Sequence, residues 1–192
     1  MLKAGKKIAI TSNSHKAINN LMLKVEELAP KKHKFMKVTR HEEEDLINGI
    51  SNIDFLPTAS KFKEDHFNAE IIGGTAFTFA NGNFQGYFDY LFIDEAGQMS
   101  LANLVSMSRC TKNIILIGDQ MQLEQPIQAE HPGESGLSTL EYFLEDYKTI
   151  PKKLGYFLPI TRRMNQELCS FVSKCFYDKR LFSHESTNIN QL

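Results

Sequence analysis

The feature that most constrains the fold is a short apolar run that ends in two adjacent carboxylates. Residues Tyr90–Ile93 are aromatic or aliphatic, and Asp94 and Glu95 follow directly. Such short runs are typical of buried strands in parallel sheets. Because α/β sheets bind ligands at the carboxyl ends of their strands, these acids are expected at a ligand site. The sequence therefore predicts an α/β fold with a functional edge beside Asp94.

A second apolar run ends in the same way. Ile114–Ile117 is followed by Gly118 and Asp119, with Gln122 close behind. Two hydrophobic strands that each end in Asp, with Gly or Gln nearby, indicate a repeated structural device.

Near the N-terminus, a predicted strand at Ile8–Thr11 continues through a polar turn, Ser12–His15, into a predicted helix at Lys16–Leu28. Ser14 is a suitable N-cap for that helix. Hydroxyl and amide groups at a helix N-terminus also bind phosphate well. The residues alone leave both interpretations open and favour plain capping.

The middle of the chain changes character. Residues 30–68 are rich in Lys, Glu and His, and carry two opposed charge runs that are typical of solvated surfaces. Phe35–Thr39 is the one short strand predicted within them. A further strand, beginning at Glu70, enters a Gly-Gly-Thr turn that ends at Thr75.

Beyond Glu95, the sequence predicts three further helices and, near the C-terminus, one further strand. Ser100 is expected to cap a short helix, and a second helix is predicted at Leu137–Tyr147. A strand at Tyr156–Leu158 and a helix at Asn165–Tyr177, with its aromatic side chains buried, complete the expectation.

Composition excludes some classes of protein. The chain has 192 residues, a net charge of −1 and 42% hydrophobic residues, which is ordinary for a soluble domain. The three cysteines form no CxxC pair, which favours buried thiols in a reducing compartment. No apolar stretch approaches a membrane span and no signal-peptide pattern is present, so a cytoplasmic protein without membrane contact is expected.

Four segments resemble motifs of superfamily 1 helicases and occur in the same order. Ala9–Leu21 resembles motif Ia, Asp94–Gln98 resembles motif II (the Walker B box), and Gly118–Pro126 resembles motif III. Thr161–Asn165, followed by Phe176–Asp178, resembles the arginine motif that opens the second motor domain. The motifs have the form found in the Upf1/Dna2-like branch. Residues 131–133 and 137–144 further resemble bacterial members fused to a RecB-like nuclease.

The resemblance implies a RecA-like parallel sheet flanked by helices, ATP and Mg²⁺ as cofactors, and single-stranded DNA or RNA as partner. Asp94 would hold Mg²⁺ through water, and Glu95 would act as general base. Gln122 would sense the γ-phosphate, and Arg163 would stabilise charge on the transferring phosphoryl group.

The resemblance also implies two sets of binding residues. The nucleotide-binding set is Asp94, Gln98, Asp119 and Gln122. The nucleic-acid-binding set is Thr11, Ser12, Asn13, Ser14, His15 and Thr75.

The sequence also departs from the family pattern. It contains no GxxxxGK[ST] phosphate loop and no match to motifs V and VI. Glu124 stands where Pro is common, Arg162 replaces a Tyr, and Asn165 replaces a His. The expected fold is therefore an incomplete P-loop NTPase domain.

The expected organisation follows from these motifs. Residues 1–155 would be the C-terminal part of a first RecA-like domain, with 30–68 as a candidate insertion, and 156–192 would begin the second. The chain would be a fragment of an ATP-dependent helicase or translocase that works with the rest of its chain, and with a nuclease domain where one is fused. Alone it should show negligible ATP turnover.

Two alternatives stay open. One is a non-catalytic, helicase-like module that binds nucleic acid or a protein partner. The other is a different hydrolase that borrows its phosphate loop from a neighbouring subunit.

Overall fold

The computed structural model describes residues 1–29, 33–41, 43–123, 132–145 and 147–189. The chain forms two compact units, Met1–Tyr142 and Phe143–Leu192. The predicted boundary between residues 155 and 156 falls inside the second unit, and the assignment of motor domains to these units stays a prediction. In the described ranges, no helix is long and apolar enough to cross a membrane.

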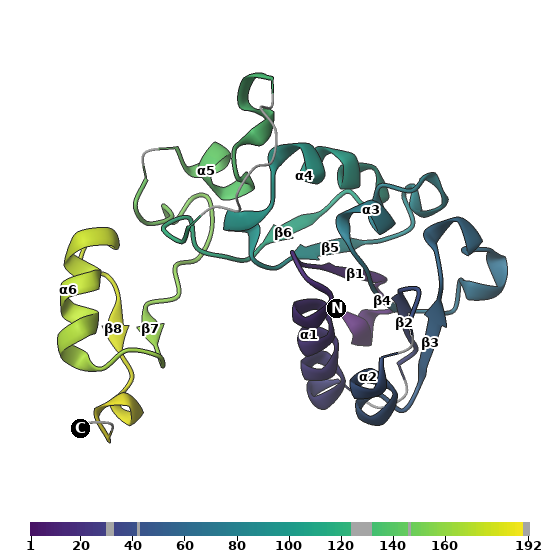
Figure 1. The fold of residues 1–192 in the computed structure, drawn as a ribbon, viewed down its shortest axis with the longest axis horizontal. Helices are drawn as coiled ribbons and strands as arrows, with labels where there is room; N and C mark the ends of the chain where they lie inside the picture. Colours follow the sequence, from purple (N-terminus) through teal and green to yellow (C-terminus); the bar gives the residue numbers. More distant parts are fainter. Residues whose placement is uncertain (30–32, 42, 124–131, 146, 190–192) are drawn as a thin grey trace. The chain divides into compact units, whose positions relative to one another are not determined.

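Six parallel strands form the sheet of the first unit (Figure 1), in the order β3-β2-β4-β1-β5-β6. Every neighbouring pair is parallel, which confirms the predicted α/β class. The strands are β1 Ile8–Thr11, β2 Phe35–Val38, β3 Ile53–Leu56, β4 Ile71–Gly73, β5 Tyr90–Ile93 and β6 Ile114–Leu116. Because all six run the same way, their carboxyl ends meet at one edge.

Helices cover both faces of this sheet. The helices of this unit are α1 His15–Leu28, α2 Glu44–Gly49, α3 Ala76–Phe79 and α4 Leu101–Met107, and α5 Thr139–Leu144 spans the boundary between the two units. Figure 1 shows α1 and α2 on one face and α3 and α4 on the other. This is the layered arrangement that a parallel sheet needs, since both of its faces are apolar.

The core on the α1 side rests on a close contact between helix and sheet. Ile18 and Met22 of α1 are fully buried. They lie over Gly73 of β4, where a Cβ atom would overlap the Met22 sulfur. Phe35 and Leu46 belong to the same cluster, so β2 and α2 share this core. β2 and β3 are strands of the six-stranded sheet itself.

The predicted strands around the motifs are confirmed, and so are two helix caps. β1 and β5 have the bounds that their apolar runs predicted. Ser14 accepts a hydrogen bond from the Ala17 amide at 3.2 Å, and Ser100 accepts one from the Asn103 amide at 3.3 Å. β3 and α2, in contrast, were not predicted.

The second unit differs from its sequence prediction in two places. Tyr156–Leu158 is not a strand; the short pair β7 (Ile160–Thr161) and β8 (Phe182–Ser183) lies further along. Helix α6 (Gln166–Phe176) forms as predicted, with Asn165 as its cap. Its buried face was predicted wrongly: Cys169 and Ser173 are buried, whereas three large apolar side chains are 43% to 65% exposed, those of Leu168, Phe171 and Phe176.

Candidate functional site

The predicted acids lie at the carboxyl edge of the sheet. Asp94 follows β5, whose residues Leu91 and Ile93 are fully buried. The Asp94 amide donates to the Thr11 carbonyl oxygen at 2.9 Å, which extends the β1–β5 ladder by one step. This places Asp94 beside the loop that follows β1, as predicted for a ligand-binding strand end.

Glu95 has an unusual backbone. Its φ of 54° and ψ of 43° lie in the left-handed region, which costs a non-glycine residue on the order of 1 kcal/mol or more. The short turn Ala96–Gln98 begins directly after it, and the Gln98 amide donates to the Glu95 carbonyl oxygen at 2.8 Å. Strained residues of this kind concentrate at functional sites, whereas the role of Glu95 as general base stays a prediction.

The loops after β5 and β6 are in direct backbone contact. The Ala96 amide donates to the Ile117 carbonyl oxygen at 2.9 Å. A Cβ at Gly97 would overlap the Asp119 carbonyl oxygen, and one at Gly118 would lie 2.8 Å from the Ala96 nitrogen. Only glycine permits this approach, so the two motif-bearing loops are joined by their backbones.

The loop after β6 is shaped by Asp119. Its carboxylate accepts a hydrogen bond from the Met121 amide at 3.0 Å, and this Asx turn leads to the exposed Gln122. The remainder of the predicted motif III, Glu124–Pro126, lies outside the described residues.

The loop after β1 is tied to the loop after β5. The Asn13 amide nitrogen donates to the Gln98 side-chain oxygen. Within this loop, Thr11 and Ser12 are buried, whereas Asn13, Ser14 and His15 are exposed. Of these five residues, only the last three are exposed to solvent.

Thr75 joins the same edge from β4. The Gly74 amide donates to the Ile10 carbonyl oxygen at 3.1 Å, and Thr75 follows at the start of α3. The Thr75 hydroxyl lies 3.4 Å from that of Thr78. The ends of four adjacent strands, β4, β1, β5 and β6, therefore bring together the predicted site residues of the first unit.

Arg163 lies in the second unit, just after β7. Its amide donates to the Thr161 hydroxyl oxygen at 3.2 Å, and the residue is exposed. Its predicted role toward the phosphates stays a prediction.

A buried group that sequence reasoning missed lies behind the loop after β1. Lys37 of β2 is fully buried, and its amine donates to Asn19 Oδ1 at 2.6 Å. The Asn19 amide nitrogen donates to Glu43 Oε2, and Glu43 Oε1 lies 3.7 Å from His15 Nδ1. The sequence feature that could have revealed this group is a lysine within an otherwise apolar strand. It was overlooked because charged residues flank the strand on both sides.

The donor set at the edge fits one kind of metal. The described residues hold no group of three or more His, Cys, Asp or Glu side chains that could bind a metal ion. Mg²⁺ commonly uses one or two carboxylates and completes its shell with water and substrate phosphates. Asp94, with Glu95 adjacent, fits that pattern and would hold the ion.

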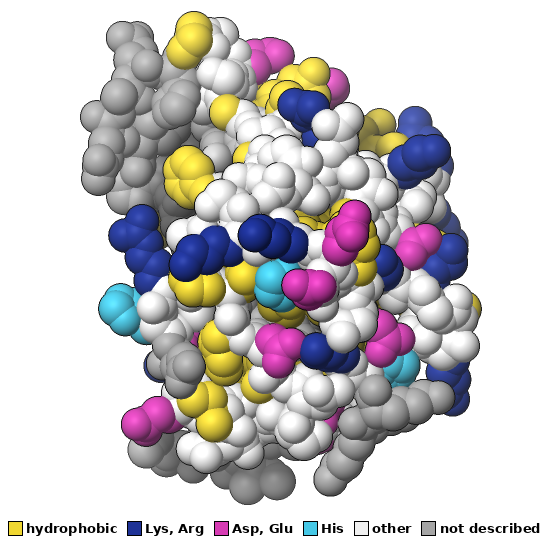
Figure 2. Space-filling model, turned by 90° about the vertical axis from the view of Figure 1, so that its right-hand side faces the viewer, with side chains coloured by type: hydrophobic (Ala, Val, Ile, Leu, Met, Phe, Trp, Pro, Cys, Tyr) yellow, Lys and Arg dark blue, Asp and Glu magenta, His cyan; other side chains and the backbone are white. Residues whose placement is uncertain are grey.

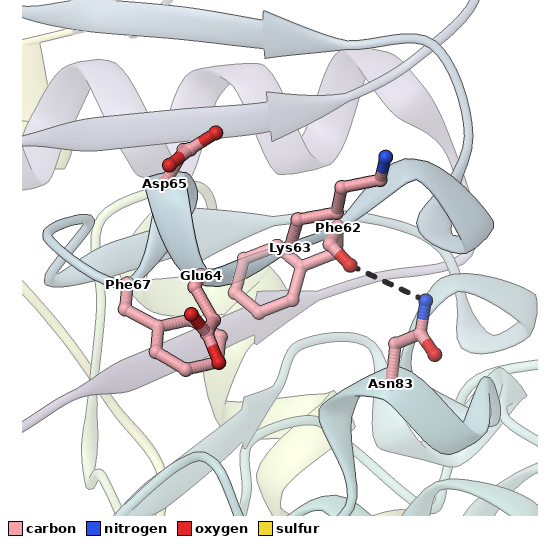
Figure 3. Close-up of a pocket in the computed structure, with 6 residues that line it drawn as sticks. All are labelled: Phe62, Lys63, Glu64, Asp65, Phe67 and Asn83. Carbon is pink, nitrogen blue, oxygen red and sulfur yellow. Dashed lines mark hydrogen bonds between the residues drawn. The ribbon is translucent and has the colours of Figure 1, made fainter.

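A pocket at the opposite edge is separate from these residues. It has a volume of about 510 Å³ and is lined by Phe62, Lys63, Glu64, Asp65, Phe67 and Asn83 (Figure 3). The Phe62 and Phe67 rings contact Tyr87, which lies just before β5, so this pocket lies at the amino ends of the strands.

The face seen in Figure 2 carries both basic and acidic side chains, and its described residues form no large area of one sign. The net charge of the whole sequence is −1.

The chain is similar to several known proteins. Residues 58–128 match a family described as an AAA domain, a range that includes β4, β5 and β6. The chain is 26% identical over 189 residues to the DNA replication ATP-dependent helicase/nuclease DNA2 of Gallus gallus, covering 92% of this chain and 18% of that protein. The corresponding Schizosaccharomyces pombe protein is 26% identical over 197 residues, covering 97% and 13%.

A third relative and one solved structure also match part of this chain. The probable helicase MAGATAMA 3 of Arabidopsis thaliana is 30% identical over 127 residues, covering 61% of this chain and 15% of that protein. The chain thus spans less than a fifth of each of these relatives. The C-terminal part of the Fun30 ATPase domain matches with a TM-score of 0.40 and 14% identity, over 76% of this chain and 47% of that one, which is too low to support an inference.

Proposed function

We propose, from the premise that this chain is a distant homologue of superfamily 1 helicases and contains an AAA domain, that its sheet edge serves ATP hydrolysis and strand binding in a helicase-type motor. One observation carries the proposal. Four adjacent parallel strands deliver their polar loops to a single edge, and hydrogen bonds join the loops after β1, β5 and β6.

The carboxylates supply the chemistry of hydrolysis. ATP with Mg²⁺, when bound, brings the phosphoryl group and neutralises much of its charge. Asp94 would hold Mg²⁺ through water, and Glu95 would act as general base toward the attacking water. The left-handed backbone of Glu95 puts this residue at a sharp turn directly after β5.

The contacts between loops supply the coupling. The side chains of Gln98 and Asn13 are hydrogen-bonded, so a movement of the loop after β5 would displace the loop after β1. Gln122 follows Asp119, whose backbone abuts Gly97. Binding of a γ-phosphate near these side chains would therefore alter the strand-binding loop through short, rigid connections.

Strand binding falls on the exposed residues Asn13, Ser14 and His15, together with Thr75. Amide, hydroxyl and imidazole groups at the start of α1 can bond backbone phosphates of DNA or RNA without reading sequence. This would suit a motor that moves along a strand.

The second candidate function is a helicase-like module that binds nucleic acid or a partner without hydrolysing ATP. The 192 residues themselves contain no GxxxxGK[ST] phosphate loop. For the chain by itself, we expect negligible turnover under either function.

The test is Mg²⁺-dependent ATP hydrolysis by the intact protein. Glu95→Gln should lower kcat by roughly a hundredfold or more while leaving KM for ATP nearly unchanged. Glu64→Gln is the matched control, because Glu64 also belongs to an adjacent Glu–Asp pair but lines the pocket at the opposite edge.

Undiminished turnover in the Glu95→Gln protein would rule out its role as general base. Absence of turnover in the unmodified intact protein, with strand binding retained, would favour the second candidate.

A further inference from the structure

Lys37 is the buried end of a series of polar side chains in contact, which leads from the sheet to the exposed loop after β1. In the strand register, Lys37 pairs with Gly73, and Gly73 pairs with Ile10 of β1. Lys37 is therefore level with the last residues of β1, close to where the loop begins. Its contacts run through Asn19 in α1 to Glu43, at the start of α2, and on to His15.

The positive charge of Lys37 and the negative charge of Glu43 offset each other. Burial lowers the pKa of Lys37 to about 8, and the negative charge of Glu43 opposes that shift. Glu43 keeps 21% of its side chain exposed, close to the exposed end of the loop. Without a buried cation behind it, this carboxylate would repel phosphate groups.

The surroundings of Lys37 contain few other charges. Glu43, at the start of α2, is the charged group that acts on the pKa of Lys37, and His15 lies 3.7 Å from the far side of its carboxylate. Glu26 of α1 is also buried, and its carboxylate accepts a hydrogen bond from Ser51. Strand β4 carries no charged residue, and Asp54 of β3 is paired with Lys34 at 2.8 Å. The charge state of Lys37 therefore acts mainly on Glu43.

We propose that Lys37 is a positioning residue for strand binding: through Asn19 it draws the Glu43 carboxylate inward, so that Glu43 orients His15 without exposing an uncompensated negative charge to the strand. This inference rests on the proposed function of the Asn13–His15 loop. It adds a role for two residues outside the helicase-like motifs.

The experiment measures binding of the chain to a fluorescent oligodeoxyadenylate, at a temperature where thermal melts show every variant folded. Lys37→Met should weaken binding roughly threefold to tenfold near neutral pH, since one compensating charge is lost. Lys37→Arg keeps the charge and should bind like the unmodified chain. The double variant Lys37→Met/Glu43→Gln, which removes both charges, should bind more tightly than Lys37→Met but less tightly than the unmodified chain, because it also loses the carboxylate that orients His15.

A pH series separates charge from packing. Between about pH 7 and pH 9, the unmodified chain should lose affinity as Lys37 releases its proton. Lys37→Arg should show no such loss, because arginine stays protonated throughout.

Two results would overturn the inference: equal affinity of the Lys37→Met and unmodified chains, or an alkaline loss of binding that persists in Lys37→Arg. The variant Asn13→Ala/His15→Ala tests the proposed strand-binding loop itself. If it binds as tightly as the unmodified chain, the proposed strand-binding loop is wrong, and the role of Lys37 fails with it.

Discussion

At the scale of single residues, the site depends on glycines as much as on acids. Gly97 and Gly118 allow the loops after β5 and β6 to touch through their backbones. The sequence indicated Asp94 and Glu95 because an apolar run precedes them. It did not indicate why Gly97 stands between the acids and Gln98, since that reason is a contact with Asp119, 22 residues further along.

Gly97→Ala should therefore lower the free energy of unfolding by roughly 1–3 kcal/mol, because the new methyl group meets backbone rather than a flexible side chain. Urea denaturation measures the change. Gly82→Ala is the control, since a Cβ at Gly82 has nothing within 4 Å and should cost little. Equal effects of the two substitutions would contradict the close approach of the loops.

Lys37 makes a prediction about stability and pH. Its pKa falls from 10.5 to about 8 on folding, so the folded protein binds fewer protons than the unfolded chain between these values. The free energy of unfolding contributed by Lys37 must then rise with pH across that window, by about 3 kcal/mol in all.

Urea denaturation of the unmodified chain and of Lys37→Met, at matched pH values, tests this. The stability of the unmodified chain relative to the variant should increase from about pH 8 to about pH 10.5. A difference that is constant over the window would show that the Lys37 amine is not buried as described.

At the scale of secondary-structure elements, predictability followed the strength of the local signal. β1 and β5 are uninterrupted apolar runs, and their bounds were predicted correctly. β3 was missed because its residues are only partly buried until Leu56, and α2 because no side chain caps its start. Tyr156–Leu158 was predicted wrongly because an apolar run need not be buried: Tyr156 is 96% exposed.

The cap of α1 gives a prediction at this scale. Ser14→Ala removes the bond to the Ala17 amide and should lower stability by about 1 kcal/mol, whereas Ser14→Asn, which can still cap, should cost much less. Thermal unfolding of both variants measures the difference. If Asn is no better than Ala, the role of Ser14 as N-cap is excluded.

At the scale of the whole molecule, the order of the strands creates the site. Motifs that are far apart in sequence meet because β1 lies between β4 and β5, with β6 next to β5. The sequence predicted that these loops would share an edge, since parallel strands require it. It could not predict the Asn13–Gln98 bond, or that Thr11 and Ser12 would be buried, because both depend on how the loops pack.

The most direct test of this account is equilibrium binding of a single-stranded oligonucleotide to the chain over a range of salt concentrations. We predict binding whose logarithm falls linearly with the logarithm of salt concentration, and a loss of about tenfold or more in Asn13→Ala/His15→Ala. Lys63→Ala/Asn83→Ala, at the opposite edge, should bind as the unmodified chain does. Binding that is lost only in the opposite-edge variant, or no binding at all, would contradict the assignment of the carboxyl edge as the strand-binding edge.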